Sequence, residues 1–266
     1  MEREKELLKN VELFVLDMDG TFYLGEHILQ GALDFLEDVR RSGKKYIFFT
    51  NNSSRAPEDY IRKLAGMNCF IDRQQIMTSG DVTIEYIKKC YSGKTVYLLG
   101  TEALTQSFLD AGIRLTEDQP DLVVVGFDTT LNYEKLEKAC TYIRQGAVFL
   151  ATHLDINCPV ENGFLPDCGA ICKTISLSTG VKPKYLGKPY PETVQMIREK
   201  TKVKKKNMAF VGDRIYTDVA TGVKNGAAGI LVLTGETTKE MLKKSRIKPD
   251  AVYQSIGEIG KALEKM

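Results

Sequence analysis

Two aspartates separated by one residue are the first feature of this sequence that could carry out chemistry. Asp17 and Asp19 stand in the segment Asp-Met-Asp-Gly-Thr, and in extended backbone such a pair points to the same side. Two carboxylates in one cavity repel each other unless a cation or a shared proton intervenes. Gly20 permits a sharp turn that directs backbone N–H groups at an anion. The pair indicates acid–base or metal chemistry on an anion, with an ordinary Asp-Gly turn as the alternative.

Three further polar segments carry residues of the same chemical kind. Thr50 opens the run Thr-Asn-Asn-Ser-Ser, where its hydroxyl and the Asn51 amide could hold phosphate oxygens or simply cap a helix. Lys188, in Gly-Lys-Pro, is a point charge suited to phosphate, although a single Lys is usually a surface residue. Asp213 offers a hard oxygen ligand for Mg²⁺. Asp218 could serve the same site or could stabilise the dipole of a helix.

The elements that must position these residues alternate between apolar runs and helical patterns, which predicts an α/β fold with a mostly parallel sheet. Buried strands that end beside the polar segments are expected at residues 11–16, 46–49 and 208–211. In open parallel sheets, ligands bind beyond the carboxyl ends of the strands. We therefore expect Asp17, Thr50 and Asp213 at one edge of a sheet. Further helices and strands of this part are predicted at residues 32–41, 57–64, 191–200, 217–225, 229–233, 251–253 and 256–264.

The middle of the chain repeats the alternation and predicts a second α/β unit. Its expected strands are residues 95–99, 122–125 and 148–151, and its expected helices are residues 103–111 and 133–146. The predicted organisation is a core made of residues 1–79 and 183–266, interrupted by an inserted unit at residues 80–182.

Composition excludes several classes of function. Hydrophobic residues at 43% and charged residues at 27% are ordinary for a globular protein. A formal net charge of +2 argues against nucleic acid or a membrane surface as the main partner. The charged N-terminus is expected to lead straight into a strand rather than to act as a signal peptide. The six cysteines lack the spacing of a zinc site or a disulfide scaffold, so buried thiols and a cytoplasmic location are expected.

Taken together, the four segments resemble the haloacid dehalogenase (HAD) superfamily, in the same order along the chain. The residues that carry this resemblance are Asp17-x-Asp19-Gly20-Thr21, a strand ending in Thr50, Gly187-Lys188-Pro189 and Gly212-Asp213-x-x-x-x-Asp218. Within the superfamily, the chain is similar to the NagD-like, p-nitrophenyl phosphatase branch. The stretches that are typical of this branch are Thr50-Asn51-Asn52-Ser53, Asp167-Cys168-Gly169-Ala170 and Val232-Leu233-Thr234-Gly235.

The resemblance implies a Rossmann-like core, an α/β cap at residues 80–182 that selects the substrate, and phosphatase activity on small phosphate monoesters. Such esters include p-nitrophenyl, sugar and nucleotide phosphates. It implies that Asp17 is the nucleophile, which forms an aspartyl-phosphate, and that Asp19 is the general acid and base. Thr50, Asn51 and Lys188 would bind the phosphoryl oxygens.

The resemblance also implies a Mg²⁺ ion, held by Asp17, Asp213 and the main-chain carbonyl of Asp19, with Asp218 orienting the groups around it. In the cap, His153 and Asp155 are expected to contact the substrate. Vertebrate pyridoxal-phosphate phosphatases carry a His before Pro in the same loop, where this chain has Cys158. Pyridoxal phosphate is therefore not supported as the specific substrate.

Other functions remain open from the residues. A phosphotransferase or phosphomutase would use the same aspartyl-phosphate, and a non-hydrolytic protein could bind phosphorylated ligands on the same fold. A dehalogenase is disfavoured by Asp19, and a response-regulator receiver is disfavoured by the chain length and by the spacing of the acidic pair. Monomer and homodimer are both compatible with the sequence.

Overall fold

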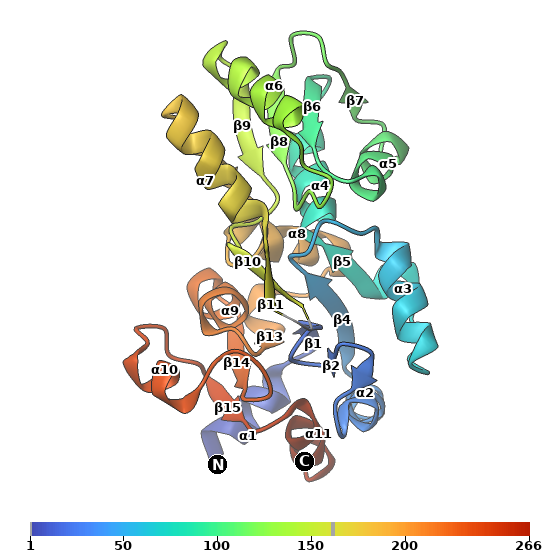
Figure 1. Ribbon diagram of the computed structural model, residues 1–266. Helices are drawn as coiled ribbons and strands as arrows, with labels where there is room; N and C mark the ends of the chain where they lie inside the picture. Colours follow the sequence, from blue (N-terminus) through green and yellow to red (C-terminus); the bar gives the residue numbers. More distant parts are fainter. Residues whose placement is uncertain (1, 161–162) are drawn as a thin grey trace. The chain divides into compact units, whose positions relative to one another are not determined.

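The computed structural model describes residues 2–160 and 163–266, and the chain forms two compact units (Figure 1). The first unit contains Met1–Thr50, Ile61–Met77 and Lys188–Met266. The second contains Asn51–Tyr60 and Thr78–Gly187. The second unit thus includes all of residues 80–182, the range predicted for the cap, with residues 78–79 and 183–187 on either side and a short segment that follows Thr50 directly.

A six-stranded sheet forms the centre of the first unit. Its strands, in spatial order, are β15 (Ala251–Tyr253), β14 (Ala228–Val232), β13 (Met208–Gly212), β1 (Leu13–Leu16), β4 (Lys45–Thr50) and β5 (Ile76–Thr78). The pairs from β15 through to β4 are parallel. Every residue of β1, β13 and β14 is buried, as continuous apolar strands covered on both faces require. These findings confirm the predicted α/β fold class.

Helices complete the first unit. They are α1 (Glu2–Asn10), α2 (Ala32–Arg41), α8 (Pro191–Thr201), α9 (Ala220–Asn225), α10 (Lys239–Lys244) and α11 (Ile256–Glu264), while α3 (Pro57–Gly66) begins in the second unit. Short turns of 3₁₀-helix occupy Arg73–Gln75 and Lys205–Asn207, and a small hairpin joins β2 (Tyr23–Leu24) to β3 (His27–Ile28). The bounds of α2 and α11 equal the predicted ranges. The bounds of β15 also equal the predicted range, and α9 begins three residues later than predicted. The other predicted ranges of this unit differ by one or two residues at an end, as helix and strand ends commonly do.

The N-terminus corrects one expectation. The charged segment does not lead straight into a strand, because Glu2–Asn10 is a helix. Its residues are good helix formers, with glutamates in the first turn and Lys9 in the last turn, where each charge suits the helix dipole. Burial of Leu8 fixes this helix to the core.

The second unit has its own five-stranded sheet. In spatial order the strands are β12 (Lys184–Tyr185), β9 (Val148–Ala151), β8 (Leu122–Val125), β6 (Thr95–Leu99) and β7 (Arg114–Leu115), and all their pairs are parallel. The bounds of β6, β8 and β9 equal the predicted ranges. A separate antiparallel hairpin joins β10 (Asn157–Val160) to β11 (Gly163–Pro166).

Alternating side chains of this sheet bury two helical layers. Val123 and Val125 pack with α6 (Tyr133–Arg144) and α7 (Cys168–Thr179) on one face. Leu122 and Val124 pack with α4 (Ser79–Cys90) and α5 (Glu102–Asp110) on the other. This two-residue period is the one that a strand imposes on its side chains, and Figure 1 shows the two helical layers on opposite faces of the sheet.

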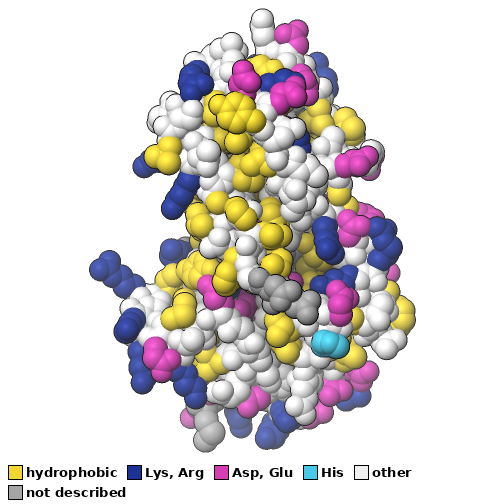
Figure 2. Space-filling view, in the orientation of Figure 1, with side chains coloured by type: hydrophobic (Ala, Val, Ile, Leu, Met, Phe, Trp, Pro, Cys, Tyr) yellow, Lys and Arg dark blue, Asp and Glu magenta, His cyan; other side chains and the backbone are white. Residues whose placement is uncertain are grey.

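The surface and the thiols agree with the composition. Acidic and basic side chains are interspersed over the face that Figure 2 shows. All six cysteines are free thiols, and four of them are buried. Among the described residues, every helix is too short or too polar to cross a bilayer.

Candidate active site

The register of three neighbouring strands brings the chemically active segments together at one edge of the first unit. Leu16, the last residue of β1, pairs with Phe48 of β4 and with Val211 of β13. The residues that follow Leu16, Phe48 and Val211 therefore lie at the same edge of the sheet. Asp17 is one of them, and its N–H donates to the Val211 carbonyl at 2.9 Å. Thr50 and Asp213 end or follow the flanking strands, as the sequence predicts.

Lys188 is the cation at the centre of this edge. Its Nζ lies 2.6 Å from an oxygen of Asp17 and 2.6 Å from an oxygen of Asp218. It also donates to the main-chain carbonyl of Phe49 at 3.3 Å, next to Thr50. Only 3% of the Lys188 side chain is exposed. The lysine therefore joins the ends of two strands and the segment after a third.

Asp213 completes a group of three carboxylates. One oxygen each from Asp17, Asp213 and Asp218 lies within 4.8 Å of the others. The two oxygens of Asp213 accept hydrogen bonds from the Glu236 N–H at 2.6 Å and from the Thr21 hydroxyl at 3.3 Å. This carboxylate is therefore fixed before any ligand arrives.

Two glycines make room beside Asp213. A Cβ atom on Gly20 would lie 2.8 Å from Asp213 Oδ2, and one on Gly235 would lie 2.0 Å from it. Gly20 also has a positive φ of 78°, a conformation that favours glycine. Larger residues at either position would displace the carboxylate.

The electrostatics of this group show an excess of negative charge. Burial, followed by repulsion from Asp218, raises the pKa of Asp17 to about 8, although Lys188 opposes the shift. Burial and the same Asp218 carboxylate raise the pKa of Asp213 to about 6. Burial works to lower the pKa of Lys188, but the carboxylates of Asp17 and Asp218 raise it above the ordinary lysine value.

One buried ammonium cannot neutralise three carboxylates, and the donors are hard oxygens. Both properties fit a divalent cation such as Mg²⁺. Bound there, a cation would favour the ionised form of Asp17 at neutral pH.

The backbone that carries Asp218 has an unusual conformation. The predicted helix at residues 217–225 begins instead with a π-helical turn, Ile215–Val219, which continues into α9. Such turns are rare and are often found at functional sites. One Asp218 oxygen accepts from the Arg214 N–H at 3.0 Å, while the other contacts Lys188 at 2.6 Å. A Cβ on Gly212 would lie 2.3 Å from the Asp218 side chain, so this close approach requires glycine.

The other predicted phosphate and acid–base residues lie nearby in the chain. Asp19 is exposed, in the turn where the Gly20 N–H donates to the Tyr23 carbonyl at 2.9 Å. Thr50 is half-buried at the end of β4. Asn51 belongs to the second unit, where its side-chain amide donates to Asp155 at 3.0 Å. In the first unit, Lys188 thus lies beside Asp17 and the end of β4. Asp213 and Asp218, which follow β13, lie close to Asp17.

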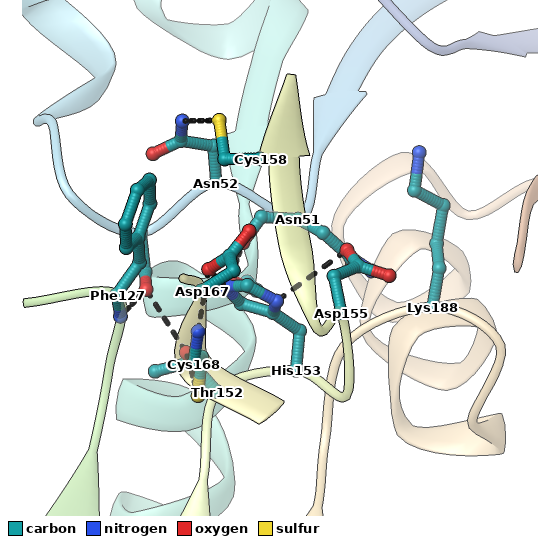
Figure 3. Close-up of polar contacts among 12 residues, drawn as sticks. Asn51, Asn52, Phe127, Thr152, His153, Asp155, Cys158, Asp167, Cys168 and Lys188 are labelled. Carbon is teal, nitrogen blue, oxygen red and sulfur yellow. Dashed lines mark hydrogen bonds and ion pairs between the residues drawn. The ribbon is translucent and has the colours of Figure 1, made fainter. Parts of the chain in front are cut away.

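His153 and Asp155, predicted to contact the substrate, are 0% and 5% exposed in the second unit. Figure 3 shows the His153 ring between the carboxylates of Asp155 and Asp167. Contact of these two residues with substrate stays a prediction, and their burial favours an indirect contribution.

Sequence reasoning gave no role to several groups that shape the site. These are the Thr21 hydroxyl, the Glu236 N–H, the Phe49 carbonyl and, in the second unit, Asp167. Thr21 and Asp167 stand inside quoted motifs, so their position was a usable signal. Main-chain donors and acceptors leave no signal in residue type.

Comparisons with known proteins indicate the family of the chain. A family model described as haloacid dehalogenase-like hydrolase matches residues 14–114, and a HAD-hydrolase-like model matches residues 185–259. An acid sugar phosphatase of Staphylococcus saprophyticus is 36% identical over 97% of this chain and 100% of its own length.

Solved structures are similar over nearly the whole chain. A 4-nitrophenylphosphatase from Thermotoga maritima is 48% identical, with a TM-score of 0.94, over 97% of this chain and 99% of its own. NagD from E. coli K-12 is 29% identical, with a TM-score of 0.87, over 93% and 98% of the two chains. The chain therefore belongs to the haloacid dehalogenase-like hydrolases, among the phosphatases of the NagD and p-nitrophenyl phosphatase branch.

Proposed function

We propose that this protein hydrolyses small phosphate monoesters in a Mg²⁺-dependent reaction, with Asp17 as the nucleophile. The observation that carries this proposal is the contact of Asp17 with Lys188, at 2.6 Å, inside a group that also contains Asp213 and Asp218. This arrangement pairs an attacking carboxylate with a cation that can meet the phosphoryl group.

The reaction proceeds in two displacements. An oxygen of Asp17 attacks phosphorus, the bond to the ester oxygen breaks, and Asp19 gives its proton to the departing alkoxide. Asp19, now ionised, takes a proton from water as that water attacks the aspartyl-phosphate. Inorganic phosphate leaves and both aspartates return to their starting states. The exposed position of Asp19, two residues after Asp17, supports this role because the leaving group and water both need access to it.

Three residues hold the phosphoryl oxygens in the proposed mechanism. Lys188 supplies positive charge, Thr50 a hydroxyl, and Asn51 an amide. The contact of Lys188 with the Phe49 carbonyl supports this grouping, since it joins the lysine to the end of the strand that carries Thr50.

Asp17, Asp213 and the main-chain carbonyl of Asp19 would hold the Mg²⁺ ion, and Asp218 would orient the groups around it. When bound, the ion neutralises negative charge so that an anionic carboxylate can approach an anionic phosphate. The raised pKa values of Asp17 and Asp213 support this assignment, because a cation would offset the burial and the repulsion from Asp218 that raise them.

Substrate choice is proposed to reside in the second unit, with residues 80–182 as a cap that excludes water and large substrates. Relatives are named acid sugar phosphatase and 4-nitrophenylphosphatase, so sugar phosphates are the first candidates, followed by nucleotide phosphates. The six free thiols support a cytoplasmic location.

The test is the release of inorganic phosphate from a panel of sugar, nucleotide and p-nitrophenyl phosphates, with Mg²⁺ and with EDTA. We expect turnover of several esters with Mg²⁺ only. Asp17→Asn serves as the matched control for contaminating phosphatases, since it removes the nucleophile and keeps the shape. No turnover of any ester by the wild-type protein would refute the proposal. Transfer to an added alcohol instead of water would identify a phosphotransferase.

A further inference from the structure

A buried imidazole lies between two buried carboxylates in the second unit. His153 is 0% exposed, Asp155 is 5% exposed and Asp167 is 4% exposed. His153 Nδ1 lies 3.4 Å from an oxygen of Asp155, and Nε2 lies 3.5 Å from an oxygen of Asp167. Among the described residues, neither ring nitrogen has a hydrogen-bond partner of good geometry, and the two carboxylates lie at ion-pair distance. Each nitrogen therefore has a carboxylate as its polar neighbour.

This arrangement selects one protonation state. An ionised carboxylate only accepts hydrogen bonds, and a neutral imidazole has one N–H. Whichever nitrogen carried that hydrogen, the other would turn a lone pair toward a buried anion. The imidazolium ion has an N–H for both carboxylates. Burial works to lower the pKa of His153, but Asp167, Cys168 and Asp155 raise it to about 9.

A metal ion is the competing explanation for this cluster. The three side chains offer one ligand atom each within 4.8 Å of one another. However, the ring itself stands between the carboxylates and turns a different nitrogen toward each (Figure 3). One ion could bind only one of these nitrogens, so the geometry favours the imidazolium.

One end of the cluster is anchored to α7. Asp167 caps this helix and accepts from the Cys168 N–H at 2.6 Å. The Gly169 N–H donates to the Asp155 carbonyl at 2.7 Å. A Cβ on Gly169 would lie 2.1 Å from the Leu154 carbonyl oxygen, so only glycine allows this approach. The loop that carries His153 is thus fixed to the first turn of the helix.

The other end reaches Asn51, which is itself a proposed phosphate ligand, and Gly187, the residue before Lys188. The Asp155 oxygen that faces His153 accepts from the Asn51 side-chain amide at 3.0 Å. The Gly187 N–H donates to the Thr152 carbonyl at 2.7 Å. A Cβ on Gly187 would lie 2.7 Å from Asn51 Oδ1, so these two residues are packed together.

Asn51 and Gly187 connect the cluster to the proposed phosphate site through their neighbours in the chain. Asn51 follows Thr50 in the chain, and Gly187 precedes Lys188. We propose that His153, as a buried imidazolium between Asp155 and Asp167, is a positioning residue that fixes Asn51 and Gly187 and thereby the phosphate contacts next to them. The inference rests on the proposed function. It also differs from direct contact with substrate, because the phosphoryl group is common to all esters and the leaving group is not.

The first experiment compares His153→Gln with His27→Gln, a change at the exposed histidine of β3. Gln is neutral and cannot donate to two carboxylates on opposite sides. We expect kcat/KM to fall by about 10- to 100-fold in His153→Gln, by the same factor for p-nitrophenyl, sugar and nucleotide phosphates. The affinity for inorganic phosphate, measured by calorimetry with Mg²⁺, should fall as well. His27→Gln should match the wild type.

Asp167→Asn provides a second variant, in case His153→Gln does not fold. It keeps an oxygen to cap α7 and removes the charge that faces His153, so we expect the same uniform loss. A change in the ranking of esters would overturn the inference in favour of direct substrate contact. Unchanged kinetics in folded variants would also overturn it.

The second experiment reads the protonation state directly and does not depend on turnover. The chain has two histidines, so long-range ¹H–¹⁵N spectra of the wild type and of His27→Gln assign both rings. At pH 7.5, both ring nitrogens of His153 should carry hydrogen, with titration near pH 9. A neutral ring, or one equivalent of a transition metal that broadens or shifts these signals, would overturn the inference. An inactive wild-type protein with a protonated His153 and intact phosphate binding would instead refute the proposed function alone.

Discussion

The Nζ atom of Lys188 lies 2.6 Å from Oδ1 of Asp17, and both side chains are largely enclosed. The ammonium therefore holds the proposed attacking oxygen in place before a substrate arrives. It also cannot neutralise Asp17, Asp213 and Asp218 together, which leaves the group anionic.

Asp17→Asn should remove turnover while the protein stays folded. The amide has the shape of the carboxylate but is a far weaker nucleophile, so we expect a loss on the order of 10⁴-fold or more. Phosphate release and circular dichroism measure the two effects. A folded Asp17→Asn protein with a near wild-type rate would exclude Asp17 as the nucleophile.

The loss of rate in Asp19→Asn should depend on the leaving group of the ester. An alkoxide needs a proton more than p-nitrophenolate does, so sugar phosphates should lose more rate than p-nitrophenyl phosphate, by roughly 10²-fold or more. The measurement is kcat for both esters in the variant and the wild type. Equal losses would show that Asp19 does not protonate the leaving group.

EDTA should abolish activity and Mg²⁺ should restore it, whereas Ca²⁺ should restore little. Mg²⁺ holds its oxygens in a compact octahedron, and Ca²⁺ takes more oxygens at longer distances, which would misplace Asp17 for attack. Rates after metal removal and replacement test this prediction. Full activity of metal-stripped protein would contradict it.

Asp213→Asn should have opposite effects on activity and on stability. The Mg²⁺ concentration for half-maximal rate should rise, because a ligand charge is lost. In EDTA, however, the melting temperature should stay equal or rise by a few degrees, since burial and repulsion already disfavour the ionised Asp213. Thermal unfolding in EDTA measures this. A large loss of stability there would show that Asp213 is favourably paired without a cation.

The stability that depends on His153 should vary with pH in a definite direction. Its pKa in the folded protein is raised from 6.5 to about 9. The contribution is therefore complete below about pH 6.5 and is lost as the pH rises through 9, on the order of 3 kcal/mol in total. Wild-type protein should exceed His153→Gln in unfolding free energy at pH 6, and the gap should narrow by pH 10. A gap that is constant with pH would show that His153 is not charged in the fold.

Much of this architecture could be predicted because it is encoded locally. Uninterrupted apolar runs identify β1, β6 and β8, and clear amphipathic spacing identifies α2 and α11. The helix α4 was missed although Thr78 and Asp81 form a capping box at its start, because Gly80 and the short apolar run obscure the helical period. Local signals thus recover most elements and fail where propensity is mixed.

The contacts of the site depend on the tertiary structure to different degrees. The segments of Asp17 and Asp213 could be placed at one edge, because parallel strands present their carboxyl ends together. The pairing of Lys188 with Asp218 could not be predicted, because Asp218 lies in a π-helical turn and no residue pattern indicates such a turn. The approach of Asp167 to His153 likewise arises only in the folded structure.

The central strand of the first unit has a consequence for synthesis on the ribosome. Leu13 of β1 pairs with Lys45 on one side but with Met208 on the other. The strands of the second sheet, by contrast, all lie between Thr95 and Tyr185. During N-to-C translation, that sheet can form while β1 still has an open edge, and Asp213 has not yet emerged. The nascent chain therefore cannot assemble its acidic group until Asp213 and Asp218 have left the ribosome.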